Sequence, residues 1–144
     1  ARPDVIFAPP YFKDYNPDHD YTGYLAFIAR INACIKLIET EHPPTAKVPP
    51  MFYCVPFGIN SAYCPDYFVD ITDTFKTKME MFLCHESQQG AWCKDAFGVD
   101  YAEMLERENK AMAVACGTPG VDYVEGFMLC KSWPIVAGAH RYLP

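Results

Sequence analysis

Short apolar runs alternate with longer stretches of helical periodicity along this chain, and the alternation constrains the fold more than any other feature. Runs with strand character cover residues 4–8, 51–55, 67–71 and 123–130. Apolar side chains at helical spacing predict helices over 19–40, from a cap at Thr72 or Asp73 to about Leu83, and over 100–116. Strands that alternate with helices are typical of α/β proteins. The pattern therefore predicts an α/β layer structure in which the strands run parallel.

The composition supports one packed domain over residues 1–144 and argues against two classes of partner. Hydrophobic side chains make up 51% of the chain and charged ones 21%, so a core can form. The net charge is −6 and the basic residues are scattered. This distribution argues against nucleic acid and anionic membrane surfaces as partners. No run approaches the ~18 consecutive apolar residues of a membrane span.

The seven cysteines indicate reduced thiols rather than a disulfide framework. Their number is odd, no Cys-x-x-Cys occurs, and most of them fall within helical or strand patterns. Buried reduced cysteines are typical of cytoplasmic proteins, so we expect a cytoplasmic location. A disulfide framework is the alternative.

The densest group of polar side chains is the loop Asp14-Tyr15-Asn16-Pro17-Asp18-His19, which follows closely on the apolar run Val5-Ile6-Phe7-Ala8. An imidazole can bind a divalent metal near pH 7, and carboxylates can bind the metal, orient the ring or move protons. A calcium loop is excluded, because its sixth position is His19 instead of glycine and its twelfth is Leu25 instead of glutamate. Two interpretations stay open: an Asx-type turn in which Asp18 caps the following helix, and a metal site with His19 as a ligand.

A second polar group, His85-Glu86-Ser87-Gln88, lies at the end of a predicted helix. His85 can line a pocket, or it can satisfy free carbonyl groups at the helix C-terminus. Lys78 fits a solvated helix face better than a functional role. Glu125 lies among apolar residues of a strand and needs a partner if it is buried, so it is either paired or reaches a pocket.

Taken together, these motifs resemble the LmbE-like, or PIG-L, zinc-dependent N-acetylglucosaminyl deacetylases. Residues 14–19 are similar to the Asp-x-His-Pro-Asp-His block of that family, and the preceding strand opens with Pro3-Asp4-Val5, as the family's Pro-Asp-Val does. Three later segments are also similar to motifs of the family. Val69-Asp70-Ile71-Thr72, followed by Lys78, is similar to its Val-Asp-Ile-Thr strand and helix lysine. His85-Glu86-Ser87-Gln88 is similar to its His-x-Ser-Gln signature, and Tyr123-Val124-Glu125-Gly126-Phe127 to its Tyr-x-Glu-x-Phe strand. Order and spacing fit from residue 3 to about residue 130.

The resemblance implies a Rossmann-like three-layer sandwich with a mainly parallel sheet and zinc at the C-terminal edge of that sheet. It implies hydrolysis of the N-acetyl group of an N-acetylglucosaminyl substrate, in which zinc polarises the carbonyl group and lowers the pKa of water toward ~7. Asp18 would be a carboxylate that orients its neighbourhood. The implied site residues are His19 at the metal, Asp18, Asn16 and Asp14 in catalysis, and His85, Ser87 and Gln88 at the substrate.

The chain departs from the family pattern in two places. The family's His-Pro-Asp-Asp motif, which supplies two zinc ligands and the catalytic base, is absent. We therefore expect that this is the C-terminal portion of the domain, incomplete at its N-terminus, and that a missing segment or a second chain supplies the other ligands. In addition, Asn16 replaces a histidine that is the candidate acid, and an amide cannot give up a proton at neutral pH, so Asp14 or His85 would have to substitute.

Three functions stay open from the sequence. The first is an N-deacetylase within a more complete chain or assembly. The second is a catalytically inactive domain that binds a sugar or a protein partner, and the third is hydrolysis of another amide. A homo-oligomer is also left open.

Overall fold

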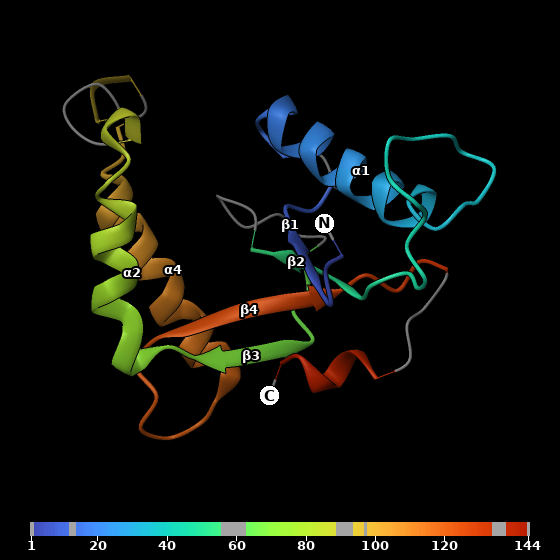
Figure 1. Cartoon of the computed structure of the whole chain (residues 1–144). Helices are drawn as coiled ribbons and strands as arrows, with labels where there is room; N and C mark the ends of the chain where they lie inside the picture. Colours follow the sequence, from blue (N-terminus) through green and yellow to red (C-terminus); the bar gives the residue numbers. More distant parts are fainter. Residues whose placement is uncertain are drawn as a thin grey trace. The chain divides into compact units, whose positions relative to one another are not determined.

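The computed structural model describes residues 2–11, 14–55, 63–88, 94–96, 98–133 and 138–143 (Figure 1). Within them, a four-stranded sheet has the order β1-β2-β4-β3. Its strands are β1 (Ile6–Ala8), β2 (Met51–Cys54), β3 (Tyr67–Asp70) and β4 (Val124–Leu129). The helices are α1 (Pro17–Asn32), α2 (Phe75–Phe82) and α4 (Tyr101–Cys116), with short 3-10 segments at Thr72–Thr74, Glu86–Gln88 and Ala139–Arg141. The predicted α/β class is confirmed.

The direction of the strands corrects the prediction of a mainly parallel sheet. β1 and β2 are parallel, with Phe7 opposite Phe52, whereas β2 and β4 are antiparallel, with Tyr53 opposite Met128. In the described part of the chain, α2, of eight residues, and α4, of sixteen, both stand between β3 and β4. A single crossover helix returns the chain for a parallel strand, while a second helix carries it to the other end, so that the next strand runs the opposite way.

The chain divides into two compact units, Ala1–Tyr67 with Gly126–Pro144, and Phe68–Glu125. The core of the first unit is made of buried side chains from β1, β2 and their neighbours, including Ala8, Met51, Tyr53, Tyr63 and Cys130. The Tyr63 hydroxyl lies 2.9 Å from the Tyr53 carbonyl oxygen and 2.8 Å from that of Gly126. Tyr63 therefore joins β2 to β4 inside the core.

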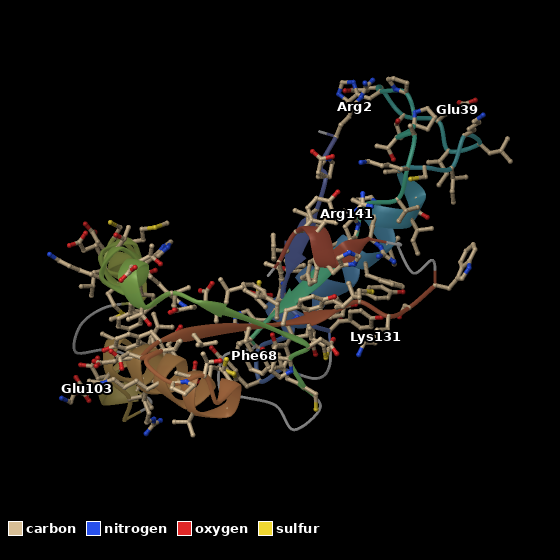
Figure 2. The ribbon with its side chains drawn as sticks, turned by 90° about the horizontal axis from the view of Figure 1, so that it is seen from below. Arg2, Glu39, Phe68, Glu103, Lys131 and Arg141 are labelled. Atoms are coloured by element: carbon tan, nitrogen blue, oxygen red, sulfur yellow. The ribbon has the colours of Figure 1, made fainter. Side chains whose placement is uncertain are left out.

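A surface ion pair lies just after the end of β4 in the same unit. Lys131, labelled in Figure 2, places Nζ 2.5 Å from Oδ1 of Asp66. The other carboxylate oxygen of Asp66 accepts the backbone N–H of Leu129 at 3.0 Å. The hydrogen bond to Asp66 raises the pKa of Lys131, although a pair this exposed adds little to stability.

Helix α1 begins earlier and ends earlier than its periodicity predicts. Asn16, not Asp18, is the N-cap: its side chain accepts the Asp18 N–H at 3.0 Å, and Pro17 takes the first helical position, which needs no N–H donor. The prediction that the helix extends to residue 40 is wrong. The chain returns at Thr45, whose N–H donates to the Ala33 carbonyl oxygen at 2.7 Å, so this carbonyl at the end of the helix bonds outside it.

Two residues on one face of α1 are buried, Gly23 and Arg30. A Cβ atom at Gly23 would lie 2.3 Å from the Pro9 carbonyl oxygen, so the helix can approach the segment after β1 only with glycine there. The Arg30 guanidinium lies 5.6 Å from the centre of the Phe27 ring, and its Nε and Nη2 atoms have no hydrogen-bond partner among the described residues.

The second unit, Phe68–Glu125, is built by α2, α4 and the strands beside them. The Asp100 side chain caps α4 by accepting the N–H groups of Ala102 and Glu103, and Gly117 ends the helix with a φ of 70°. Phe75 at the start of α2 stacks on Tyr123 with ring centres 3.7 Å apart. The ends of both helices agree with the prediction to within three residues, but the predicted cap of α2 at Thr72 or Asp73 is wrong, because Thr74 precedes the helix and its side chain makes no capping bond.

None of the helices in the described part of the chain is both long and apolar enough to cross a membrane. Six cysteines lie in that part and none of them forms a disulfide, while Cys93 lies outside the described residues.

Candidate functional site

The polar loop before α1 forms a compact group around the carboxylate of Asp14. The Asp14 side chain is only 2% exposed, and its Oδ1 atom lies 3.1 Å from His19 Nδ1. The same oxygen accepts the backbone N–H of Asn16 at 3.0 Å. Because a carboxylate can only accept, Nδ1 must carry the hydrogen and Nε2 must carry the lone pair when the ring is neutral.

The other nitrogen of the His19 ring lies beside Asn16. Asn16 Nδ2 is 3.5 Å from His19 Nε2, and the His19 side chain is 38% exposed. The ring is therefore held on one side by a buried acceptor, while its lone pair lies next to an amide that can donate. This is the arrangement in which a carboxylate orients a metal-ligating histidine.

The carboxylates of the first turn of α1 have different surroundings. Asp20 Oδ1 accepts the backbone N–H of Asp14 at 3.0 Å, which ties the loop to the helix. Asp18 is exposed, and the bonds that involve it are backbone ones: its N–H donates to Asn16, and its carbonyl oxygen accepts the Thr22 hydroxyl at 2.7 Å. In the described residues, the carboxylate that contacts the His19 ring is thus Asp14, whereas the resemblance implies an orienting role for Asp18.

The described residues offer one ligand of a metal site but not a complete set of ligands. They include no group of three or more His, Cys, Asp or Glu side chains that could hold a metal ion. His19 can offer Nε2, with Asp14 behind it, but a catalytic zinc usually has three protein ligands.

The second polar group lies in the other compact unit. α2 ends at Phe82, and the N–H of His85 donates to the Phe82 carbonyl oxygen at 3.0 Å. His85 and Ser87 are exposed, and Ser87 and Gln88 belong to the short 3-10 segment. Their role at a substrate stays a prediction.

Two of the motif segments have clear structural partners within the second unit. Lys78 Nζ lies 2.5 Å from Glu125 Oε1 and 2.9 Å from Asn109 Oδ1, so it joins α2 to β4 and α4. Asn109, which is 5% exposed, also donates to the Leu105 carbonyl oxygen. The sequence left two alternatives open for Glu125, and this geometry selects the paired one. The sequence pattern did not indicate a role for Asn109, because its contact with Lys78 depends on how α2 and α4 pack together.

The Asp70-Ile71-Thr72 turn joins β3 to β4. Asp70 Oδ1 accepts the Thr72 N–H at 2.9 Å, and the hydrogen bonds from the Thr72 side chain and backbone lower the pKa of Asp70. The Thr72 hydroxyl oxygen accepts the N–H groups of Asp122 and Tyr123. This motif therefore has a structural role of its own.

A cavity of about 390 Å³ adjoins the Asp14 loop. Its walls are Tyr11, Asp14, Pro17, Asp20, Tyr21 and Tyr24. The three tyrosines have no signal in the sequence pattern, because Tyr11 and Tyr24 meet only when the chain folds back after β1.

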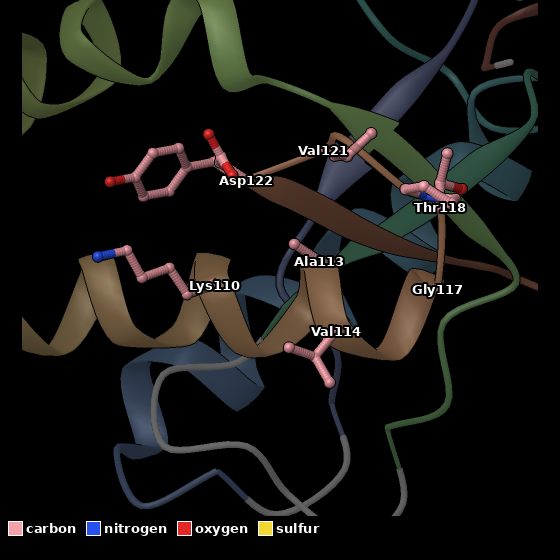
Figure 3. A pocket seen from close by; sticks show the side chains of 9 residues that line it. Lys110, Ala113, Val114, Gly117, Thr118, Val121 and Asp122 are labelled. Carbon is pink, nitrogen blue, oxygen red and sulfur yellow. The ribbon is translucent and has the colours of Figure 1, made fainter.

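A larger depression of about 640 Å³ lies along the C-terminal half of α4 and the loop that follows it, as Figure 3 shows. Lys110 supplies its one basic side chain among the described residues, but Lys110 Nζ lies 2.7 Å from Glu106 Oε1 and 5.5 Å from the centre of the Tyr123 ring. The hydrogen bond to Glu106 raises the pKa of Lys110. None of the site residues implied by the resemblance lines this depression.

Comparisons with known proteins agree with the resemblance seen in the motifs. No protein-family model matches the chain. Over 128 residues the chain is 28% identical to the diacetylchitobiose deacetylase of Thermococcus kodakarensis, which corresponds to 87% of this chain and 44% of the relative. The chain therefore spans less than half the length of that relative.

Solved structures share the fold over most of the chain. The conserved protein TT1542 of Thermus thermophilus matches with a TM-score of 0.70 and 25% identity, over 93% of this chain and 53% of its own. The N,N'-diacetylchitobiose deacetylase of Pyrococcus horikoshii, solved with an inhibitor, matches with a TM-score of 0.68 and 24% identity over 89% and 46%. The 4-carboxy-2-hydroxymuconate hydratase GalB of Pseudomonas putida matches with a TM-score of 0.65 and 22% identity over 93% and 54%.

A hydratase on the same fold means that the fold alone does not determine the reaction. The motifs and the deacetylase relative point the same way, however. Over most of its length this chain is similar to the LmbE-like, or PIG-L, deacetylases.

Proposed function

We propose that this chain is part of a metal-dependent hydrolase that removes the N-acetyl group of an N-acetylglucosaminyl substrate. The observation that carries the proposal is the His19 ring, whose Nδ1 is held by the buried Asp14 carboxylate, so that the lone pair is on Nε2, where the Asn16 amide is its neighbour at 3.5 Å and would give way to a metal ion. The deacetylase relative supports the reaction and the class of substrate. The residues 1–144 would form the C-terminal portion of one domain.

His19 would hold the metal through Nε2, and Asp14 would fix the ring and its tautomer. A zinc ion supplies polarisation of the acetyl carbonyl group and a lowered pKa for water. The remaining ligands and the base would come from a part of the protein outside these 144 residues. The match to only 44% of the relative leaves room for such a part.

Asn16 would donate a hydrogen bond to the negative charge that develops on the substrate oxygen. It cannot protonate the leaving amine, so that step needs another acid, for which Asp14 and His85 are the candidates in this chain. Asp14 is already engaged as an acceptor for two donors. Asp18, exposed at the start of α1, would be a second carboxylate for the catalytic role that the resemblance implies.

A second function is favoured by the absence of a three-ligand cluster from the described residues and by Asn16 at the position of the family's acid. The chain would then be an inactive domain that binds a sugar or a protein partner. Zinc content separates the two functions.

The test is zinc analysis and deacetylase assay of the complete protein after dialysis. We expect His19→Ala to lose zinc and activity together, while Asp14→Asn weakens zinc affinity about 10- to 100-fold. His42→Ala, which changes an exposed loop histidine, is the matched control and should keep both. Stoichiometric zinc in His19→Ala would refute the ligand assignment, and a zinc-free, inactive unaltered protein would favour the binding domain.

A further inference from the structure

Arg30 is a buried charge on the core-facing side of α1. Gly23, Phe27 and Arg30 follow the spacing i, i+4 and i+7, so they share one side of the helix. On this side Gly23 approaches the Pro9 carbonyl oxygen, and Phe27 packs against the core of the first unit. Arg30 is only 2% exposed. The guanidinium group is therefore enclosed by the fold rather than extended into solvent.

The positive charge of Arg30 has no counterion in the described residues. An arginine in a protein keeps its charge, and a buried charge without a partner is costly. All 18 Asp and Glu side chains of the sequence lie within the described residues. None of the ion pairs that the structure has there includes Arg30. In the described part of the chain, an acidic side chain thus does not compensate this charge.

Two neighbours stabilise the cation without satisfying its N–H groups. Arg30 lies in the last turn of α1, where the helix dipole favours positive charge. The centre of the Phe27 ring lies 5.6 Å from the guanidinium carbon, within the range of a cation–π contact. Among the described residues, neither contact gives Nε or Nη2 a hydrogen-bond acceptor. The dipole and the ring therefore lower the cost of burying the charge but leave its donors unused.

The two atoms without an acceptor form one edge of the guanidinium group. In this planar group Nε and Nη2 lie side by side, and one N–H bond of each points the same way. Such a pair of parallel donors matches the two oxygens of a carboxylate, or two oxygens of a phosphate or sulfate, in a bidentate contact. The unused edge of Arg30 therefore has the geometry of an oxyanion site.

This site is remote from the candidate metal ligand. Arg30 lies about three helical turns beyond His19 on α1, which corresponds to about 17 Å along the helix axis. Arg30 also does not line the cavity beside Asp14 or the depression along α4. An oxyanion at Arg30 would therefore hold the inner face of α1 in place and would not take part in the reaction at His19.

We propose that Arg30 is the binding group of a buried oxyanion site, which is occupied in the complete protein through two parallel hydrogen bonds from Nε and Nη2. Two sources share this chemistry. One is a carboxylate side chain from a part of the protein outside these 144 residues, for which the match to 44% of the relative leaves room. The other is a free anion such as phosphate. The site does not depend on the proposed deacetylase function.

The ranking of two substitutions in the complete protein tests whether an anion is bound. Arg30→Met removes the charge, whereas Arg30→Lys keeps the charge and loses the fork of parallel donors. With an anion in the site, Arg30→Met leaves that anion unpaired and should lower the melting temperature by about 10 °C, while Arg30→Lys should lower it less. Arg107→Met, which changes an exposed arginine of α4, is the matched control and should shift the melting temperature by about 2 °C at most.

The order of the two variants reverses if the site is empty. Arg30→Met then removes an unpaired buried charge, while Arg30→Lys retains one. A melting temperature of Arg30→Met equal to or above that of Arg30→Lys therefore overturns the proposal. A side chain that only fills space would also be replaced better by Met than by Lys, so the order separates a bound anion from a packing role. If Arg30→Met does not fold, Arg30→Gln is the neutral variant in the same comparison.

A phosphate titration at constant ionic strength distinguishes the two sources. With a free anion in the site, the melting temperature of the unaltered protein should rise with phosphate concentration by mass action, and Arg30→Met should not show the rise. With a carboxylate of the protein in the site, neither protein should respond to phosphate. Each of these results supports the site when Arg30→Lys ranks above Arg30→Met, and each identifies the occupant. A rise of the same size in Arg30→Met would overturn the assignment of phosphate to Arg30.

Discussion

The two nitrogens of the His19 ring have different neighbours, and the difference sets what the residue can do. Nδ1 faces a buried carboxylate oxygen at 3.1 Å, while Nε2 faces the Asn16 amide at 3.5 Å. A histidine that only filled space at a helix start would not need a carboxylate that is 2% exposed. The cost of burying Asp14 is offset by the donors that it accepts, among them the ring itself.

Asn16 has two roles that can be separated by substitution. Its Oδ1 caps α1, and its amide lies beside His19 Nε2. Asn16→His restores a group that can donate a proton, so deacetylase activity should rise about 100-fold, which is the low end of the effect of a general acid. The same substitution removes the helix cap, so the free energy of unfolding should fall by about 1 kcal/mol. Asn16→Ser keeps a cap without an acid and should not raise kcat. Equal or lower activity in Asn16→His would count against an acid at this position.

At the scale of elements, α1 is positioned by close contact with the segment after β1. Gly23 faces the Pro9 carbonyl oxygen, and this approach brings Tyr11 against Tyr24 and the polar loop against the start of the helix. The group around Asp14 therefore depends on the packing of the helix as well as on its cap.

Substitution of Gly23 tests that dependence. Gly23→Ala places Cβ 2.3 Å from a backbone oxygen, and we expect a loss of about 1–3 kcal/mol in the free energy of unfolding from the clash. Alanine's higher helix propensity, worth about 1 kcal/mol, acts in the opposite direction. Ala29→Gly at an exposed position of the same helix calibrates this propensity effect. Urea unfolding measures both variants, and a more stable Gly23→Ala would show that the contact is not made.

The sequence predicts those elements whose signal is local. Apolar runs locate the strands to within two residues, and Asp100 and Gly117 mark the ends of α4. The end of α1 was not predictable, because Ile35 and Ile38 continue the helical period although they are 39% and 41% exposed. Strand direction was missed because it depends on the path that α2 and α4 take between β3 and β4 along the chain.

In the candidate site, the proximity of Asp14, Asn16 and His19 follows from their closeness in the sequence. Their contacts do not follow from the sequence in the same way. The sequence does not show which of the nearby carboxylates contacts the His19 ring when the helix begins. The tyrosine cavity and the contact between Lys78 and Asn109 join residues far apart in the chain, and for such contacts the pattern carries no signal.

At the scale of the whole molecule, the buried Tyr53 makes the stability of the fold depend on pH in the alkaline range. Tyr53 is 3% exposed and its hydroxyl donates to Cys130 Sγ at 3.2 Å. Burial, and then the contact with Cys130, raise the pKa of Tyr53. Because the folded pKa is higher than the unfolded value of about 10, the unfolded chain releases the proton first.

The contribution of Tyr53 to stability should therefore be complete below about pH 10 and decline as the pH rises above it, by about 1.4 kcal/mol per pH unit for one group. Urea unfolding between about pH 8 and about pH 11, values that bracket the titration of an ordinary phenol, measures this decline. Tyr53→Phe removes the titrating group and should decline less steeply. Identical slopes for the two proteins would contradict the assignment.

The exposed thiols of Cys64 and Cys84 belong to different compact units, one in each. Each is a natural attachment point for a spin label or a fluorophore, because an accessible thiol reacts where buried ones do not. With Cys93 and the partly exposed Cys34, Cys54 and Cys116 replaced by serine, a doubly labelled chain would report the distance between the two labels. A change in the label separation when sugar or zinc is added would turn the two exposed thiols into a direct readout of ligand-driven motion.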